Sequence, residues 1–136
     1  MQPSEARLTD TREWLSRADL DLRSARHALA ADSLLVEDVL FHCQQAVEKA
    51  LKAFLTWHDE PFRKTHSLEE LGEQCLRLDA ALGPVVDQVA PLTEYAWRFR
   101  YPGPPERPSL EEAQQALVIA EAACEAVVRR LPLSQA

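Results

Sequence analysis

Residues 36–57, VEDVLFHCQQAVEKALKAFLTW, form a segment whose composition strongly favours a helix. Ala, Leu, Glu, Gln and Lys dominate it, and these residues lose little conformational freedom in a helix. One broad arc of that helix is apolar and contains Val39, Cys43, Ala46, Val47, Ala50, Leu51, Ala53 and Phe54. Beside it runs a polar stripe of His42, Gln45, Lys49 and Lys52, and Phe41 and Leu55 lie amid the polar side. Such a helix needs cover on two sides and belongs in the middle of a bundle or at a contact between subunits.

Apolar residues repeat with a helical period in the segments 11–31, 67–78, 83–97 and 109–131 as well. Asp10 and Glu13 are typical of the start of the first of these helices, and Ser67 and Ser109 each begin a capping box. Pro91 should kink the fourth helix of the chain. No segment is typical of a strand.

The resulting prediction is a single all-α domain, an up-and-down bundle of four to five helices. We place the bundle at residues 11–131, between an N-terminal tail at 1–10 and a C-terminal tail at 132–136.

Composition excludes several classes of function. The net charge of −7, with only three lysines, argues against general nucleic-acid binding, which needs concentrated positive charge. Three glycines in the whole chain exclude a glycine-rich phosphate loop. No apolar run approaches the roughly 18 residues of a membrane span, and the N-terminus lacks the pattern of a signal peptide. We therefore expect a cytoplasmic protein without membrane contact.

Metal and nucleophilic chemistry have little support in the sequence. No histidine or cysteine spacing matches a zinc site, and no Glu-x-x-His pair recurs. Cys43, Cys75 and Cys124 each fall on an apolar helix face, as buried free thiols do. We expect no metal, no cofactor and no catalytic residue.

If short connections make the helices alternate in direction, four helix ends meet at one pole of the bundle. Two helix N-termini, at Ser67 and Ser109, should point there and favour an anion. We name this predicted region the cationic pole; it collects Lys52, Arg63, Lys64, His66, Arg98, Arg100, Tyr101 and Arg107. His42 lies about 22 Å before the end of the central helix and should be far from it.

Each of these side chains also has a structural interpretation. Lys52 follows Glu48 by four residues, the favourable order for a solvated surface pair. His66 precedes a capping box and could be a structural hydrogen-bond partner. Arg98 and Arg100 could clamp the proline-rich loop by bonding the last carbonyls of a helix.

Four motifs resemble the HEPN domain (higher eukaryotes and prokaryotes nucleotide-binding). They are residues 18–25 (ADLDLRSA), 44–55 (QQAVEKALKAFL), 64–68 (KTHSL) and 100–102 (RYP), and the similarity covers residues 11–131. The resemblance implies a helical bundle that is often dimeric and often paired with a minimal nucleotidyltransferase, in toxin–antitoxin or defence systems. By similarity, the recurring polar positions of the family are occupied by Lys49, Lys52, His66, Arg100 and Tyr101.

The nuclease branch of that family uses an Arg followed, after four to six residues, by a His, and this spacing is absent here. Our leading hypothesis is therefore a non-catalytic module that forms a homodimer and binds a nucleotide such as ATP, or a nucleotidyltransferase partner, through the cationic pole. Its candidate ligand-binding residues are Lys49, Lys52, His66, Arg98, Arg100 and Tyr101. The alternatives are a metal-independent ribonuclease toxin and a structural dimeric adaptor that uses the Phe41/Leu55 side of the central helix.

Overall fold

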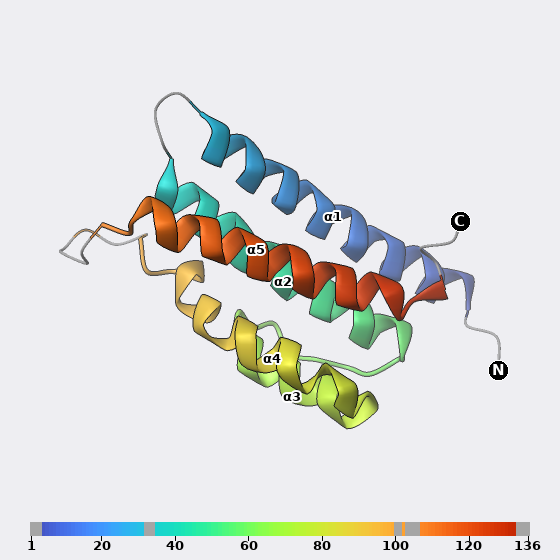
Figure 1. The fold of residues 1–136 in the computed structure, drawn as a ribbon. Coiled ribbons are helices and arrows are strands. Elements are labelled where there is room, and N and C mark those ends of the chain that lie inside the picture. Colours follow the sequence, from blue (N-terminus) through green and yellow to red (C-terminus); the bar gives the residue numbers. More distant parts are fainter. Residues whose placement is uncertain (1–3, 32–34, 100–101, 103–106, 133–136) are drawn as a thin grey trace.

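The computed structural model describes residues 4–31, 35–99, 102 and 107–132, and every regular element in these ranges is helical (Figure 1). In chain order the elements are α1 (Glu5–Ala30), α2 (Val36–Trp57), α3 (Leu68–Leu78), the 3-10 helix η1 (Ala80–Leu82), α4 (Gly83–Val89), the 3-10 helix η2 (Ala90–Ala96) and α5 (Leu110–Arg129). The predicted all-α bundle is confirmed, and the predicted bounds of α2 match.

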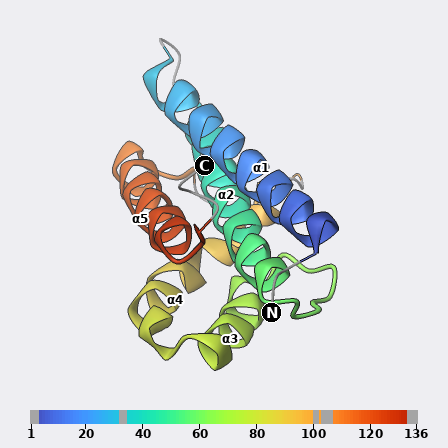
Figure 2. The ribbon, with the colours of Figure 1, turned by 90° about the vertical axis from the view of Figure 1, so that its right-hand side faces the viewer.

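Helix α2 lies at the centre of the bundle, packed against α1, α5, α3 and η2 (Figure 2). Its apolar arc is fully covered, with Val39, Cys43 and Ala46 inaccessible to solvent. The opposite side is covered as well, because Leu55 is also inaccessible and Phe41 is half-buried. The predicted two-sided burial is confirmed, and Leu55 is therefore not available to a partner of an adaptor surface.

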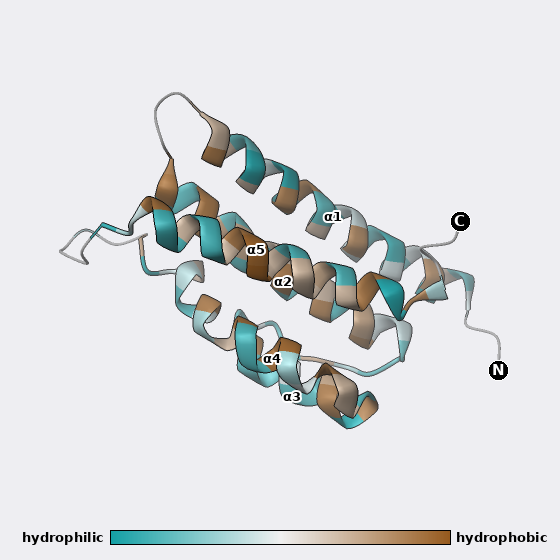
Figure 3. Cartoon of the chain, in the orientation of Figure 1, coloured by the Kyte–Doolittle hydropathy of each residue, from teal (hydrophilic) through white to brown (hydrophobic). Residues whose placement is uncertain are grey.

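Each long helix carries hydrophobic and hydrophilic segments in alternation (Figure 3). The three cysteines lie on buried faces, as predicted from their helical positions. Burial raises the pKa of the Cys43 thiol and of the Cys75 thiol to about 12. Neither is a reactive thiolate near neutral pH.

Helix α1 begins at Glu5, six residues before the predicted start at Thr11. Ser4 is the N-cap, and its Oγ accepts a hydrogen bond of 3.1 Å from the Arg7 backbone N–H. The prediction from Asp10 and Glu13 was wrong because no helix-breaking residue separates this true cap from the apolar pattern that follows.

The predicted fourth helix is divided near its middle. Its α-helical part ends at Val89 and the chain continues as η2, whose first turn contains Pro91. Proline has no N–H to donate to the preceding turn, and this accounts for the change from α-helix to 3-10 helix. The predicted kink at Pro91 therefore takes the form of this change. Helix α3 packs on α4 at Gly72, where an added Cβ would lie 2.6 Å from Val86 Cγ1.

Helix α3 runs in the same direction as α2, contrary to the alternation assumed from the sequence. Its start lies beside the middle of α2, where the Gln44 side chain donates a hydrogen bond of 3.0 Å to the His66 carbonyl. Farther along, Cys75 lies against the Leu51 carbonyl. Residues 58–67 therefore return along α2 before α3 begins (Figure 1).

Candidate functional site

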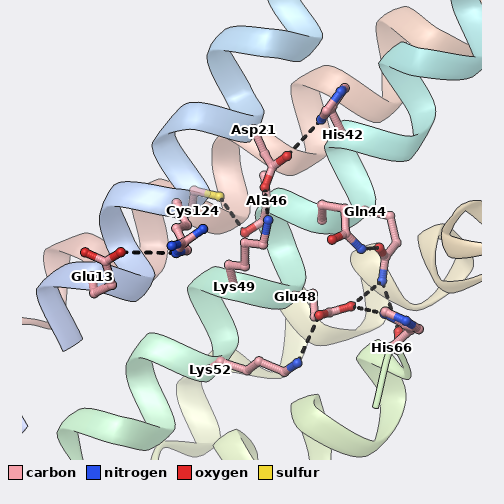
Figure 4. A network of polar contacts seen from close by, with 12 residues as sticks. Glu13, Asp21, His42, Gln44, Ala46, Glu48, Lys49, Lys52, His66 and Cys124 are labelled. Atoms are coloured by element: carbon pink, nitrogen blue, oxygen red, sulfur yellow. Dashed lines mark hydrogen bonds and ion pairs between the residues drawn. The ribbon is translucent and has the colours of Figure 1, made fainter. Parts of the chain in front are cut away.

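The polar stripe of α2 is organised around two buried carboxylates, Asp21 and Glu48 (Figure 4). Asp21 comes from α1, and Glu48 comes from α2 itself. Each carboxylate contacts one lysine and one histidine. The stripe is thus a pair of polar clusters with fixed geometry.

Asp21 joins α1 to α2. One of its oxygens lies 2.8 Å from His42 Nδ1, and the other accepts a hydrogen bond of 2.5 Å from Lys49 Nζ. Sequence reasoning missed Asp21 as a site residue. Its signal is its position on the apolar stripe of α1 between Ala18 and Leu22, where a carboxylate is buried and needs partners.

Glu48 holds the second cluster together. Its Oε1 accepts from Gln44 Nε2 at 3.2 Å and lies 2.7 Å from His66 Nδ1, while its Oε2 accepts from Lys52 Nζ at 2.9 Å. Burial opposes ionisation of Glu48, but the hydrogen bonds from His66 and Lys52, the charge of Lys52 and the hydrogen bond from Gln44 outweigh it and lower the pKa of Glu48 below its ordinary value. The carboxylate is ionised at neutral pH.

Lys52 is buried rather than solvated. The predicted pairing with Glu48 is present, but the two side chains are only 9% and 5% exposed. The Lys52 ammonium lies 5.4 Å from the centre of the Trp14 ring and 5.7 Å from that of Phe62. These rings cover the pair. The prediction of a solvated pair was wrong because Trp14 of α1 and Phe62, in the segment after α2, shield it from solvent.

His66 has an exposed side chain whose position is fixed. Its Nδ1 faces Glu48, its carbonyl accepts from Gln44, and the next residue, Ser67, caps α3 by accepting from the Glu70 N–H at 3.1 Å. The side chain is 57% exposed, which leaves the Nε2 edge open to solvent or to a ligand.

We call His42, Gln45, Lys49 and His66 the open face of α2. The first three are spaced three and four residues apart and share one side of the helix, and His66 adjoins them through its contacts with Gln44 and Glu48. Gln45 donates a hydrogen bond of 2.6 Å to the Gln44 side chain, which links this face to the Glu48 cluster. His42, expected to lie far from the cationic pole, therefore belongs to the same face as Lys49.

The described residues of the predicted cationic pole do not gather at one pole, so that prediction was wrong. Lys52 and His66 do meet, at Glu48, whereas Arg63 and Arg98 have other partners. Arg98 lies 3.3 Å from Glu112 and 3.4 Å from Glu94, and its guanidinium is 5.0 Å from the centre of the Phe99 ring. Arg107 lines a cavity of about 330 Å³ together with residues 35–38, at the start of α2.

Lys52 and His66 lie on the Glu48 cluster, because α3 starts beside the middle of α2 and not at its end. Arg63 pairs with Glu70, and Lys64 is exposed. Arg100 and Tyr101 lie outside the described residues.

Two further classes of site receive no support in the part of the chain that the structure describes. No group of three or more His, Cys, Asp or Glu side chains there could hold a metal ion. None of the helices there combines the length and the apolar character needed to cross a bilayer.

Comparison with known protein families places most of the chain in one family. The model of the HEPN domain matches residues 11–131. No curated protein matches the chain, and no solved structure does. The matched range includes α2 and all of the open face.

Proposed function

Because the chain belongs to the HEPN domain family, a family of nucleotide-binding and ribonuclease-type modules, we propose that it binds a nucleotide without catalysing a reaction on it. The open face of α2 takes the place of the cationic pole as the binding surface. A nucleotidyltransferase partner that presents a nucleotide is the alternative occupant of the same face.

The observation that carries this proposal is the fixed arrangement of Lys49 and His66. Lys49 is held by Asp21, and His66 is held by Glu48, so both donors are anchored by buried carboxylates before any ligand arrives. A side chain that is already held in place loses less conformational entropy when a ligand binds. Gln45, on the same side of α2 as Lys49, bonds the Gln44 side chain and is a further hydrogen-bonding group of the open face.

The non-catalytic role is supported by the sequence. The Arg and His spacing of the nuclease branch is absent, and Arg63, three residues before His66, is paired with Glu70 by two hydrogen bonds. Arg63 is therefore engaged by Glu70 and does not supply the arginine that the nuclease branch places beside its histidine.

We further propose a homodimer that works in the cytoplasm with a minimal nucleotidyltransferase, as part of a toxin–antitoxin or defence system. Family membership supports this assignment. Light scattering of the purified protein tests the dimer, and a monomer across the accessible concentrations would contradict it.

Calorimetric titration with ATP tests the binding proposal. We expect Lys49→Gln and His66→Gln each to weaken binding at least roughly tenfold, since a charge-assisted hydrogen bond contributes about 1.5–3 kcal/mol. Arg129→Gln is the matched control, because Arg129 is an exposed cation on α5 that pairs with Glu125, outside the open face. No binding by the wild type, or equal affinity in all variants, would contradict the proposal.

One observation favours a second candidate, a metal-independent ribonuclease. A buried carboxylate that orients an exposed imidazole is an arrangement that general bases use, and Glu48 and His66 have it. Incubation of RNA with the protein in the presence of EDTA decides between the two. Cleavage that is lost in both His66→Ala and Arg100→Ala would replace the binding proposal, whereas we expect no cleavage.

A further inference from the structure

The charges of the two clusters cancel when both imidazoles are neutral. Asp21 and Glu48 contribute two negative charges, and Lys49 and Lys52 contribute two positive ones. His42 and His66 are the remaining members, one on each carboxylate. Protonation of both would change the formal charge of the clusters from zero to two positive charges.

Most charged groups next to these histidines in the chain are acidic or paired, and Lys64, two residues before His66, is an exposed cation outside the clusters. On α1, Arg17 lies one turn before Asp21 and is paired with Glu13. On α2, Asp38 precedes His42 by one turn and is acidic. Beside His66, the first turn of α3 carries Glu69 and Glu70, and Glu70 is paired with Arg63. After η2, Arg98 is held by Glu94 and Glu112.

We propose that the open face binds a phosphate group together with protons, so that phosphate-containing ligands are held tightly only when His42 and His66 are charged. The inference rests on the proposed function and adds that nucleotide binding requires protonated imidazoles. An imidazole changes charge in the range between pH 5 and pH 8, where small changes in its surroundings matter. A phosphate beside the open face favours the charged imidazoles, and by linkage charged imidazoles favour the phosphate.

The spacing of the face indicates a ligand with more than one phosphate. Positions 42 and 49 are about 10 Å apart along the axis of α2 at 1.5 Å per residue. A single phosphate cannot contact both ends, whereas a phosphate chain reaches farther. Nucleoside triphosphates and linear polyphosphates share this chemistry, and the experiment distinguishes them.

Calorimetry with ATP and with sodium tripolyphosphate, from about pH 5.5 to about pH 8, tests the inference. Titrations in PIPES and in Bis-Tris, two buffers with different ionisation enthalpies, report the protons taken up on binding. We expect the dissociation constant to rise by about tenfold per pH unit for each proton taken up. His66→Gln and His42→Gln should each remove part of this dependence, while His27→Gln, an exposed histidine in the last turn of α1, should keep it.

The outcomes separate the two levels of the proposal. Protonation of the ligand itself is the same for every variant, so the differences between variants report the histidines. Equal pH dependence in all variants, or binding without proton uptake, would overturn the inference and leave nucleotide binding intact. Failure of ATP and tripolyphosphate to bind at any pH would overturn both. Tighter binding of ATP than of tripolyphosphate would show that the nucleoside is also recognised, with proton uptake still required.

Discussion

His66 Nδ1 lies 2.7 Å from Oε1 of Glu48, and this contact ties the segment before α3 to the middle of α2. The same carboxylate accepts from Lys52, whose ammonium faces the rings of Trp14 and Phe62. One buried glutamate therefore joins α1, α2 and the start of α3. Stability and the geometry of the open face depend on the same group.

Replacement of that carboxylate should be strongly destabilising. In Glu48→Gln the Lys52 ammonium remains buried without its counter-charge, and removal of one partner of a buried pair costs about 3–5 kcal/mol. Urea unfolding followed by circular dichroism measures the change. Glu13→Gln is the control, because its pair with Arg17 is exposed on both sides and should contribute less than about 1 kcal/mol. Equal losses of free energy of unfolding in Glu48→Gln and Glu13→Gln would contradict the structural role of Glu48.

The contribution of Glu48 should depend on pH in one direction. Its pKa in the folded protein lies below the ordinary value of 4.5, so its stabilising effect is present above that value and is lost as the pH falls through the folded pKa. The difference in free energy of unfolding between wild type and Glu48→Gln should therefore shrink below about pH 4.5. Parallel curves for the two proteins down to acid unfolding would contradict the lowered pKa.

Asp21 should matter more than the aspartate two residues before it. Asp21→Asn weakens charge-assisted hydrogen bonds to Lys49 and His42, and we expect a loss of about 1.5–3 kcal/mol. Asp19 is exposed on the same helix, and Asp19→Asn should change stability by less than about 0.5 kcal/mol. Chemical denaturation of both variants compares them directly, and a larger effect of Asp19→Asn would refute this account of the contact between α1 and α2.

The packing of α3 on α4 predicts opposite effects at two glycines. A Cβ added at Gly72 would lie 2.6 Å from Val86 Cγ1 and 3.4 Å from Val86 Cβ, a stiff β-branched neighbour, so Gly72→Ala should cost about 1–3 kcal/mol. At Gly83 nothing lies within 4 Å of the added Cβ, and φ is −47°. Gly83→Ala should therefore be neutral or stabilising, by about 0.4–1 kcal/mol. Thermal unfolding of the two variants is the measurement. A Gly72→Ala protein as stable as the wild type would contradict the close contact.

Local sequence signals predicted the helices well, because each signal acts within a few residues. The bounds of α2 follow from composition and the stop at Asp59–Pro61, and the capping boxes at Ser67 and Ser109 cap α3 and α5 as expected. The start of α1 was missed because Ser4 stands outside the apolar pattern. Nothing in residues 58–67 dictates their path, so the direction of α3 could not be inferred from connection length.

The site was predicted in its components and not in its arrangement. The polar stripe of α2 and the pairing of Glu48 with Lys52 follow from helical spacing. Burial of that pair depends on Trp14 and Phe62, which are distant in sequence, and a local rule cannot supply such cover. Asp21 was missed because a charge in a helix rich in charges looks solvated, although its place on the apolar stripe indicates burial.

The central claim is that the open face of α2 receives the nucleotide. Titration of the ¹⁵N-labelled protein with ATP, followed by two-dimensional NMR, tests it most directly. The account predicts that the largest shifts occur at Gln45, Lys49 and His66, with the side-chain resonances of His42 responding as well. Shifts confined to Arg98 and Arg107, or no shifts at saturating ATP, would contradict it.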